Sequence, residues 1–178
     1  MNSVSGEERS LTTVLPAAAE HGAAVIGLTM DENGIPPTAE GRLAIAARIR
    51  DRAVRLGISE EDVVIDPLAL TVGADSSAAS ITLRTIELVR RQLGLNITIG
   101  ASNVSFGLPD RPTINQVFIA LAIHSGADCV ITDPTKVTAT VRATDLLLGR
   151  DPHAGRFIAR FRSRPRESCS QDPGARDG

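Results

Sequence analysis

The chain has 178 residues, of which 42% are hydrophobic and 22% charged, enough for one domain with a buried core. Its formal net charge is −2, and only 2% of its residues are aromatic, with no Trp or Tyr. Nucleic-acid binding normally needs a basic field or stacking side chains, so we expect no nucleic-acid partner. No apolar run approaches the roughly 20 residues that span a bilayer, so we expect no membrane partner. The first residues lack signal-peptide order, and Cys129 and Cys169 have no disulfide or metal-site spacing; both observations predict a cytoplasmic protein.

Short β-branched runs alternate with segments of helical periodicity through most of the chain. The runs are bounded by Gly, Pro or Asp and predict buried parallel strands at 23–30, 63–67, 97–102 and 129–134. Helices are predicted at 8–21, 38–56, 78–93, 113–125 and 136–148, each followed by a glycine that ends it, with a short last helix within 150–166. This alternation predicts an α/β protein with a parallel sheet.

Two further expectations concern the second helix and the end of the chain. The helix at 38–56 carries apolar positions at Leu43, Ile45, Ile49 and Val54, which we expect to face the core. Residues 163–178 are rich in Arg, Pro, Ser and Gly and predict a disordered polar tail, which leaves 1–162 as the folded domain.

Polar residues stand at the end of each predicted strand, where parallel sheets bind their ligands. Thr29 and Asp31 follow the first strand, Asp66 ends the second, Ser102 and Asn103 the third, and Asp133 the fourth. Any one of these could equally cap the following helix, and for Asp133, with Thr135 after it, the cap is the favoured interpretation. Together they predict a mouth of amides and carboxylates. Such groups suit a pterin edge, because a carboxylate accepts two N–H donors and an amide both donates and accepts.

Several segments, in order, resemble the methyltetrahydrofolate:corrinoid methyltransferases. Their pterin-binding barrel is shared with dihydropteroate synthases and with the folate module of cobalamin-dependent methionine synthase. The most specific segment is Gly100-Ala-Ser-Asn-Val-Ser105, followed by Arg111-Pro112 and Asn115. The others are Met1-Asn-Ser3, Ile26-Gly-Leu-Thr-Met30 with Asn33-Gly-Ile-Pro36, and Ile65-Asp-Pro-Leu68.

The resemblance implies roles for five residues. Asn2 and Asp66 match positions that hydrogen-bond the pterin edge, and Asn103 matches the catalytic Asn beside N5 of the folate. Ser102 and Arg111 belong to the same segment and are expected to contact the substrate, although Arg111 could equally be a helix-terminal surface residue. The implied reaction moves the methyl group of methyltetrahydrofolate to the cobalt of a corrinoid (cobalamin) on a partner protein. No cofactor is expected to be held by this chain.

The resemblance also implies a partial (β/α)8 TIM barrel. Counted back from the last strand, the chain supplies about strands 4–8, while strands 1–3 are absent, and a complete barrel typically needs about 250 residues. A third-strand Asp of the family site is absent with them. Because a half barrel exposes unpaired strand edges, we expect a fragment of a longer gene product, a homodimer, or pairing with a chain that supplies the missing strands.

Two alternatives to the methyltransferase stay open. The first is a dihydropteroate synthase-like pterin enzyme, which needs cationic groups for a pyrophosphate near the last strands; Lys136, the single lysine of the chain, lies there. The second is a truncated pterin-binding subunit that is inactive alone. The Ser102-Asn-Val-Ser105 segment favours the methyltransferase over both.

Overall fold

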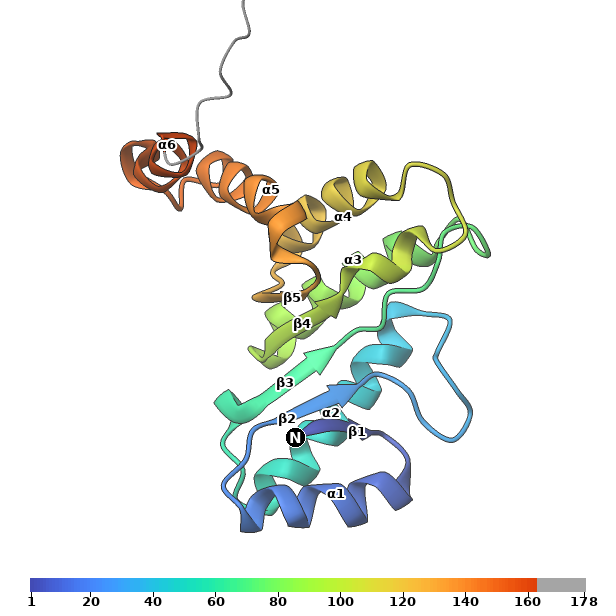
Figure 1. The fold of residues 1–178 in the computed structure, drawn as a ribbon. Coiled ribbons are helices and arrows are strands. Elements are labelled where there is room, and N and C mark those ends of the chain that lie inside the picture. Colours follow the sequence, from blue (N-terminus) through green and yellow to red (C-terminus); the bar gives the residue numbers. More distant parts are fainter. Residues whose placement is uncertain (163–178) are drawn as a thin grey trace, which may run out of the picture.

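The computed structural model describes residues 1–162, and its five strands form a single parallel sheet in chain order (Figure 1). The predicted disordered tail lies outside the described residues. The strands are β1 (Asn2–Ser5), β2 (Val25–Leu28), β3 (Val63–Asp66), β4 (Asn96–Gly100) and β5 (Cys129–Ile131). Each pairs in parallel with the next.

A helix follows every strand, as the alternation predicted. The helices are α1 (Glu8–Glu20), α2 (Ala39–Arg55), α3 (Ala78–Leu88), α4 (Arg111–Ser125), α5 (Pro134–Leu147) and α6 (Gly155–Arg162). A π-helical turn, Val89–Leu93, prolongs α3, and short 3-10 helices occupy Glu60–Asp62, Ala101–Ser105 and Pro152–Ala154. The α/β prediction is therefore confirmed, and the order of neighbouring parallel strands is that of part of a (β/α)8 barrel. That these are strands 4–8 stays a prediction.

The core lies between the helices and one face of the sheet. Strand residues on this face are fully buried, as are the apolar residues of the helices packed on it: Val25, Val63, Ile65, Ile97 and Ile99, with Leu11, Leu15, Ile49, Ile86 and Ile119. At Gly27 the packing is so close that a Cβ would lie 3.0 Å from Cγ2 of Ile49. A side chain there would separate α2 from the sheet.

The opposite face of the sheet is less well covered. Ile26, Leu28 and Val64 alternate with the buried positions of β2 and β3 and are only half-buried. On the edge strand β5, Ile131 is 52% exposed. In a closed barrel this face points inward and packs against the remaining strands.

One expectation about α2 was wrong. Val54 is 44% exposed, while the buried stripe of the helix consists of Ala39, Arg42, Ile45, Ala46, Ile49 and Ala53. Arg42 is not among the apolar positions that predict the helix, because it is charged. Its helical spacing from Ile45 and Ile49 places it in the buried stripe regardless of its charge.

Replacing Ile65 by Ala tests the helix-facing core. Ile65 is fully buried, so the variant should lose about 2–5 kcal/mol of unfolding free energy through lost burial and the cavity left behind. Urea denaturation of both proteins measures the difference. Leu147→Ala is the control, because Leu147 is 86% exposed and its removal should change stability little. Equal losses in the two variants would contradict this packing.

Candidate functional site

The carboxyl ends of the strands share one edge of the sheet because all neighbouring pairs are parallel. Asp66 is the last residue of β3 and lies opposite Leu28, the last residue of β2. Thr29 follows directly and is fully buried. Its backbone N–H and its Oγ1 both donate to the carbonyl of Asp66, each at 3.2 Å. The end of β3 is thereby tied to the loop after β2.

The carboxylate of Asp66 is half-buried and held by the turn that follows it. Its Oδ1 accepts a 2.9 Å hydrogen bond from the backbone N–H of Leu68, whose φ of 60° is left-handed. Burial raises the pKa of Asp66 above its ordinary value, and the bond from Leu68 partly opposes this by favouring the charged form. Among the described residues no hydrogen bond engages Oδ2, so this oxygen can accept from a ligand.

A buried arginine joins the loops after β2 and β3. Arg42, from α2, is 1% exposed. Its Nε donates to the carbonyl of Pro36 at 3.0 Å, and its Nη1 donates to the carbonyls of Pro67 and Leu68, both at 2.9 Å. Nη1 also lies 3.3 Å from Oγ1 of Thr82 on α3. The burial lowers the pKa of Arg42. The family motifs assign no role to Arg42. Its helical spacing from Ile45 and Ile49 is the sequence feature that could have indicated its burial.

The next strand leads into the turn that carries Ser102 and Asn103. Asn103 is exposed, and its Nδ2 lies 3.3 Å from the place of a Cβ on Gly100, so the glycine leaves room for the amide. Arg111 holds the turn from the start of α4: its Nη2 donates to the carbonyl of Ser102 at 2.8 Å and its Nε to Oγ of Ser105 at 3.1 Å. Its guanidinium also lies 5.9 Å from the centre of the Phe106 ring.

The loops after β3 and β4 are joined in turn. The N–H of Val72 donates to the carbonyl of Val104 at 2.9 Å, and Oγ1 of Thr71 donates to the carbonyl of Phe106 at 2.6 Å. Three successive loops at the carboxyl edge are therefore linked by hydrogen bonds. These bonds fix the backbone near Asp66, which ends β3, and near Asn103, which lies in the turn after β4.

Asn2 lies apart from the other predicted residues. It is exposed at the start of the edge strand β1 and pairs with Ile26, whereas Asp66 pairs with Leu28, two positions further along β2. Two strands separate β1 from β4 in the sheet. Arg111 and Ser102 are in direct contact, and Asp66 and Asn103 follow adjacent strands at the carboxyl edge, whereas Asn2 lies on the far edge strand.

A polar hollow of about 280 Å3 extends this edge toward β5. Both Ser102 and Arg111 line it, together with Asn115, Thr132, Asp133 and Lys136. The predicted capping role of Asp133 is confirmed, because its Oδ1 accepts from the N–H and the Oγ1 of Thr135 at 3.0 and 2.7 Å. These bonds lower the pKa of Asp133.

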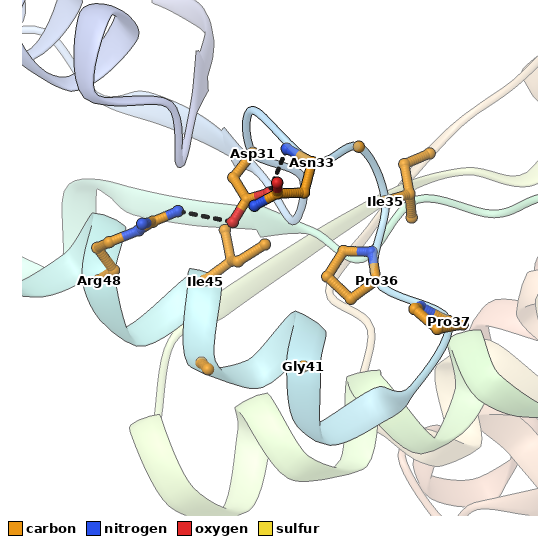
Figure 2. A pocket seen from close by; sticks show the side chains of 10 residues that line it. Asp31, Asn33, Ile35, Pro36, Pro37, Gly41, Ile45 and Arg48 are labelled. Carbon is orange, nitrogen blue, oxygen red and sulfur yellow. Dashed lines mark hydrogen bonds and ion pairs between the residues drawn. The ribbon is translucent and has the colours of Figure 1, made fainter.

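A larger hollow, of about 520 Å3, lies beside α2 (Figure 2). Figure 2 shows Arg48 of α2 reaching Asp31 in the loop after β2, and their ion pair measures 3.0 Å. Pro36, Pro37 and Ile45 supply apolar walls. The five predicted site residues are not among its lining residues, so the size of a hollow does not by itself locate the predicted site.

Comparison with known proteins agrees with this arrangement of a parallel sheet and a polar carboxyl edge. The family model described as "Pterin binding enzyme" matches residues 1–133. The chain therefore belongs to the pterin-binding enzyme family.

Two kinds of relative are similar to the chain, which confirms the resemblance drawn from its motifs. It is 31% identical over 167 residues to the methylcorrinoid:tetrahydrofolate methyltransferase of Eubacterium limosum, covering 91% of this chain and 62% of that protein. It is also 36% and 33% identical, over 141 residues, to the methionine synthases of Mycobacterium tuberculosis and Mycobacterium leprae. These matches cover 74% of this chain and 12% of each synthase.

Of the helices within residues 1–162, none combines the length and the apolar character needed to cross a bilayer.

Asp66→Asn tests the burial of the carboxylate. The pKa of Asp66 is raised in the folded protein, so the protonated carboxyl group stabilises the fold. This stabilisation is fully present below the pKa that Asp66 has in the unfolded chain, and it is lost as the pH rises through the pKa in the folded protein. At pH 7 the free energy of unfolding of the variant should therefore exceed that of wild type, by about 1.4 kcal/mol for each unit by which the pKa of Asp66 is raised. Urea unfolding at several pH values measures this gain, which should vanish in acid.

Asp133→Asn provides the control of opposite sign. The pKa of Asp133 is lowered, so its ionised form stabilises the fold above the unfolded pKa, and this is lost as the pH falls. The variant should gain nothing at neutral pH. An Asp66→Asn protein no more stable than wild type at pH 7 would contradict the assigned burial.

Proposed function

We propose that this chain takes part in methyl transfer between N5 of a folate and the cobalt of a corrinoid that another protein carries. The main support for this proposal is the carboxyl edge of β3 and β4. There the half-buried carboxylate of Asp66 and the exposed amide of Asn103 follow adjacent strands. The name of the Eubacterium limosum relative gives methylcorrinoid as methyl donor and tetrahydrofolate as acceptor. Both directions of the reaction use one site.

Asp66 is proposed to anchor the pterin. Its Oδ1 is already held by Leu68, and its other oxygen can accept an N–H from the aminopyrimidinone edge. The partial burial of the group strengthens such a bond, because water competes less for it. A pterin that donates to the carboxylate would favour its ionised form and oppose the elevation of its pKa.

Asn103 is proposed to act at N5. Its amide hydrogen-bonds the N5 region and stabilises the protonated or partly protonated amine, which is then a better leaving group. In the direction from folate to corrinoid, the N5–CH3 bond breaks while a Co–CH3 bond forms, and Co(I) becomes methyl-Co(III). The proton on N5 stays with the tetrahydrofolate. An amide cannot supply that proton, so it arrives from water or another acid.

We also propose that the five strands correspond to strands 4–8 of the complete barrel. The chain spans 62% of the length of its methyltransferase relative, and the half-buried Ile26, Leu28 and Val64 form a face that a closed barrel would cover. Strands 1–3, with their contacts to the pterin, would come from a further segment or another chain. Activity of the whole site depends on their presence.

Asn103→Ala and Asp66→Ala should separate chemistry from binding. Loss of Asn103 should slow methyl transfer roughly 100-fold or more while changing folate affinity little, because the amide acts mainly on the transition state. Loss of Asp66 should mainly weaken binding, because the pterin loses its acceptor. Calorimetric titration with methyltetrahydrofolate and single-turnover transfer to a methyl-free corrinoid protein measure both effects.

Asn96→Ala is the matched control for the amide. Asn96 begins β4, at the opposite end of the strand from the turn that carries Asn103. Its Nδ2 donates to the carbonyl of Glu61. It should leave both binding and transfer near wild type. Equal losses of rate and affinity in Asn103→Ala would contradict the role at N5, and unchanged affinity in Asp66→Ala would remove Asp66 as the anchor.

A dihydropteroate synthase-like reaction is the second candidate, and one observation favours it. Arg111 and Lys136 line the same polar hollow, where two cations could receive a pyrophosphate. Calorimetry with a pterin pyrophosphate and with methyltetrahydrofolate discriminates the two functions. We expect tighter binding of methyltetrahydrofolate, and Lys136→Gln should leave it unchanged. Preferential binding of the pyrophosphate, lost in Lys136→Gln, would favour the synthase instead.

A further inference from the structure

We infer that Arg42 is a positioning residue: it fixes the Asp66–Leu68 turn so that the Asp66 carboxylate is directed toward a bound pterin. This inference rests on the proposed function, because it assumes that Asp66 is the pterin anchor. Arg42 itself would touch no substrate atom. It would act through the two backbone carbonyls that follow Asp66.

The first support is the position of the guanidinium. A fully buried cation is costly, and Arg42 makes no ion pair with a described acidic residue. Its partners are neutral carbonyls from two loops and one hydroxyl from α3. An apolar residue could fill this space at lower cost, so stability alone gives a weak reason for an arginine. The planar fork does what an apolar residue cannot, because it bridges acceptors on separate segments.

The second support is the turn that Arg42 holds. Leu68 has a φ of 60°, a region that non-glycine residues rarely adopt and that costs energy. The N–H of this same residue holds Oδ1 of Asp66, while its carbonyl accepts from Arg42. The guanidinium of Arg42 therefore holds Leu68 through its carbonyl, and Leu68 holds the Asp66 carboxylate through its N–H. A small shift of such a group can cost much of its binding contribution.

The third support is the link through α3. Oγ1 of Thr82 donates within α3 to the carbonyl of Ala78 at 3.0 Å, and it also lies 3.3 Å from both Nη1 of Arg42 and the carbonyl of Leu68, so it touches the same cluster. Thr85, one turn further on α3, is equally buried, but its Oγ1 donates only within the helix, to the carbonyl of Ile81 at 2.8 Å. The pair offers a test variant and a control of the same size in the same helix.

The experiment compares Arg42→Lys, Thr82→Val and Thr85→Val in the full chain, together with any segment or chain needed for wild-type binding. Affinity for methyltetrahydrofolate is measured by calorimetry, and the pKa of Asp66 by carbon NMR of its carboxyl group without ligand. Arg42→Lys should weaken binding about tenfold or more, because a lysine cannot bridge the carbonyls of both loops. Thr82→Val should weaken it less. Both should change the pKa of Asp66, because a looser turn alters its exposure and weakens the bond from Leu68.

Thr85→Val should leave affinity and the pKa of Asp66 as in wild type, even if it lowers stability. In an Asp66→Asn background, Thr82→Val should cause no further loss of affinity, since its effect passes through Asp66. Thr82→Val serves as the test should Arg42→Lys fail to fold.

The outcomes separate the inference from the proposed function. If wild type binds and Asp66→Asn weakens binding, but Arg42→Lys and Thr82→Val behave like Thr85→Val, the positioning role is wrong and the proposed function stands. Equal losses in the wild-type and Asp66→Asn backgrounds also overturn it. If Asp66→Asn binds as wild type does, the proposed anchor fails, and the inference fails with it.

Discussion

Parallel pairing of consecutive strands is the constraint on which the rest of this structure depends. It places every carboxyl end at one edge of the sheet, and every following loop starts there. Residues separated by some 40 positions in the chain, such as Asp66 and Asn103, thereby come to adjacent strand ends. The helices that return the chain bury one face of each strand, so the polar residues collect at the edge and the apolar ones in the core.

The loops at that edge are not independent of one another. Thr29 and Arg42 tie the loop after β2 to the end of β3, and Thr71 and Val72 tie the loop after β3 to the turn after β4. Most of these bonds end on backbone carbonyls, which are obligatory acceptors and are left without strand partners where the sheet stops. A buried cation can be tolerated there because several carbonyl dipoles face it.

The same sheet is less complete on its other face. Half-buried Ile26, Leu28 and Val64 and the exposed Ile131 of the edge strand are the side chains that a closed barrel would enclose. Family membership and this open face agree with part of a (β/α)8 barrel. Under the proposed function, the described residues would form one wall of a pterin site, and its chemistry would depend on what completes that wall.

The sequence by itself determined the alternation of strands and helices, the helix ends at glycines, the cap at Asp133 and the family motifs around Asp66 and Asn103. These features are local, since each depends on neighbouring residues and a fixed periodicity. Only the tertiary structure decided that Arg42 meets carbonyls of two loops, that Asn2 lies at the far edge from Asn103, and that Arg111 and Lys136 share a hollow. Contacts of this kind join segments far apart in the chain. No local pattern specifies which carbonyls a buried guanidinium will meet.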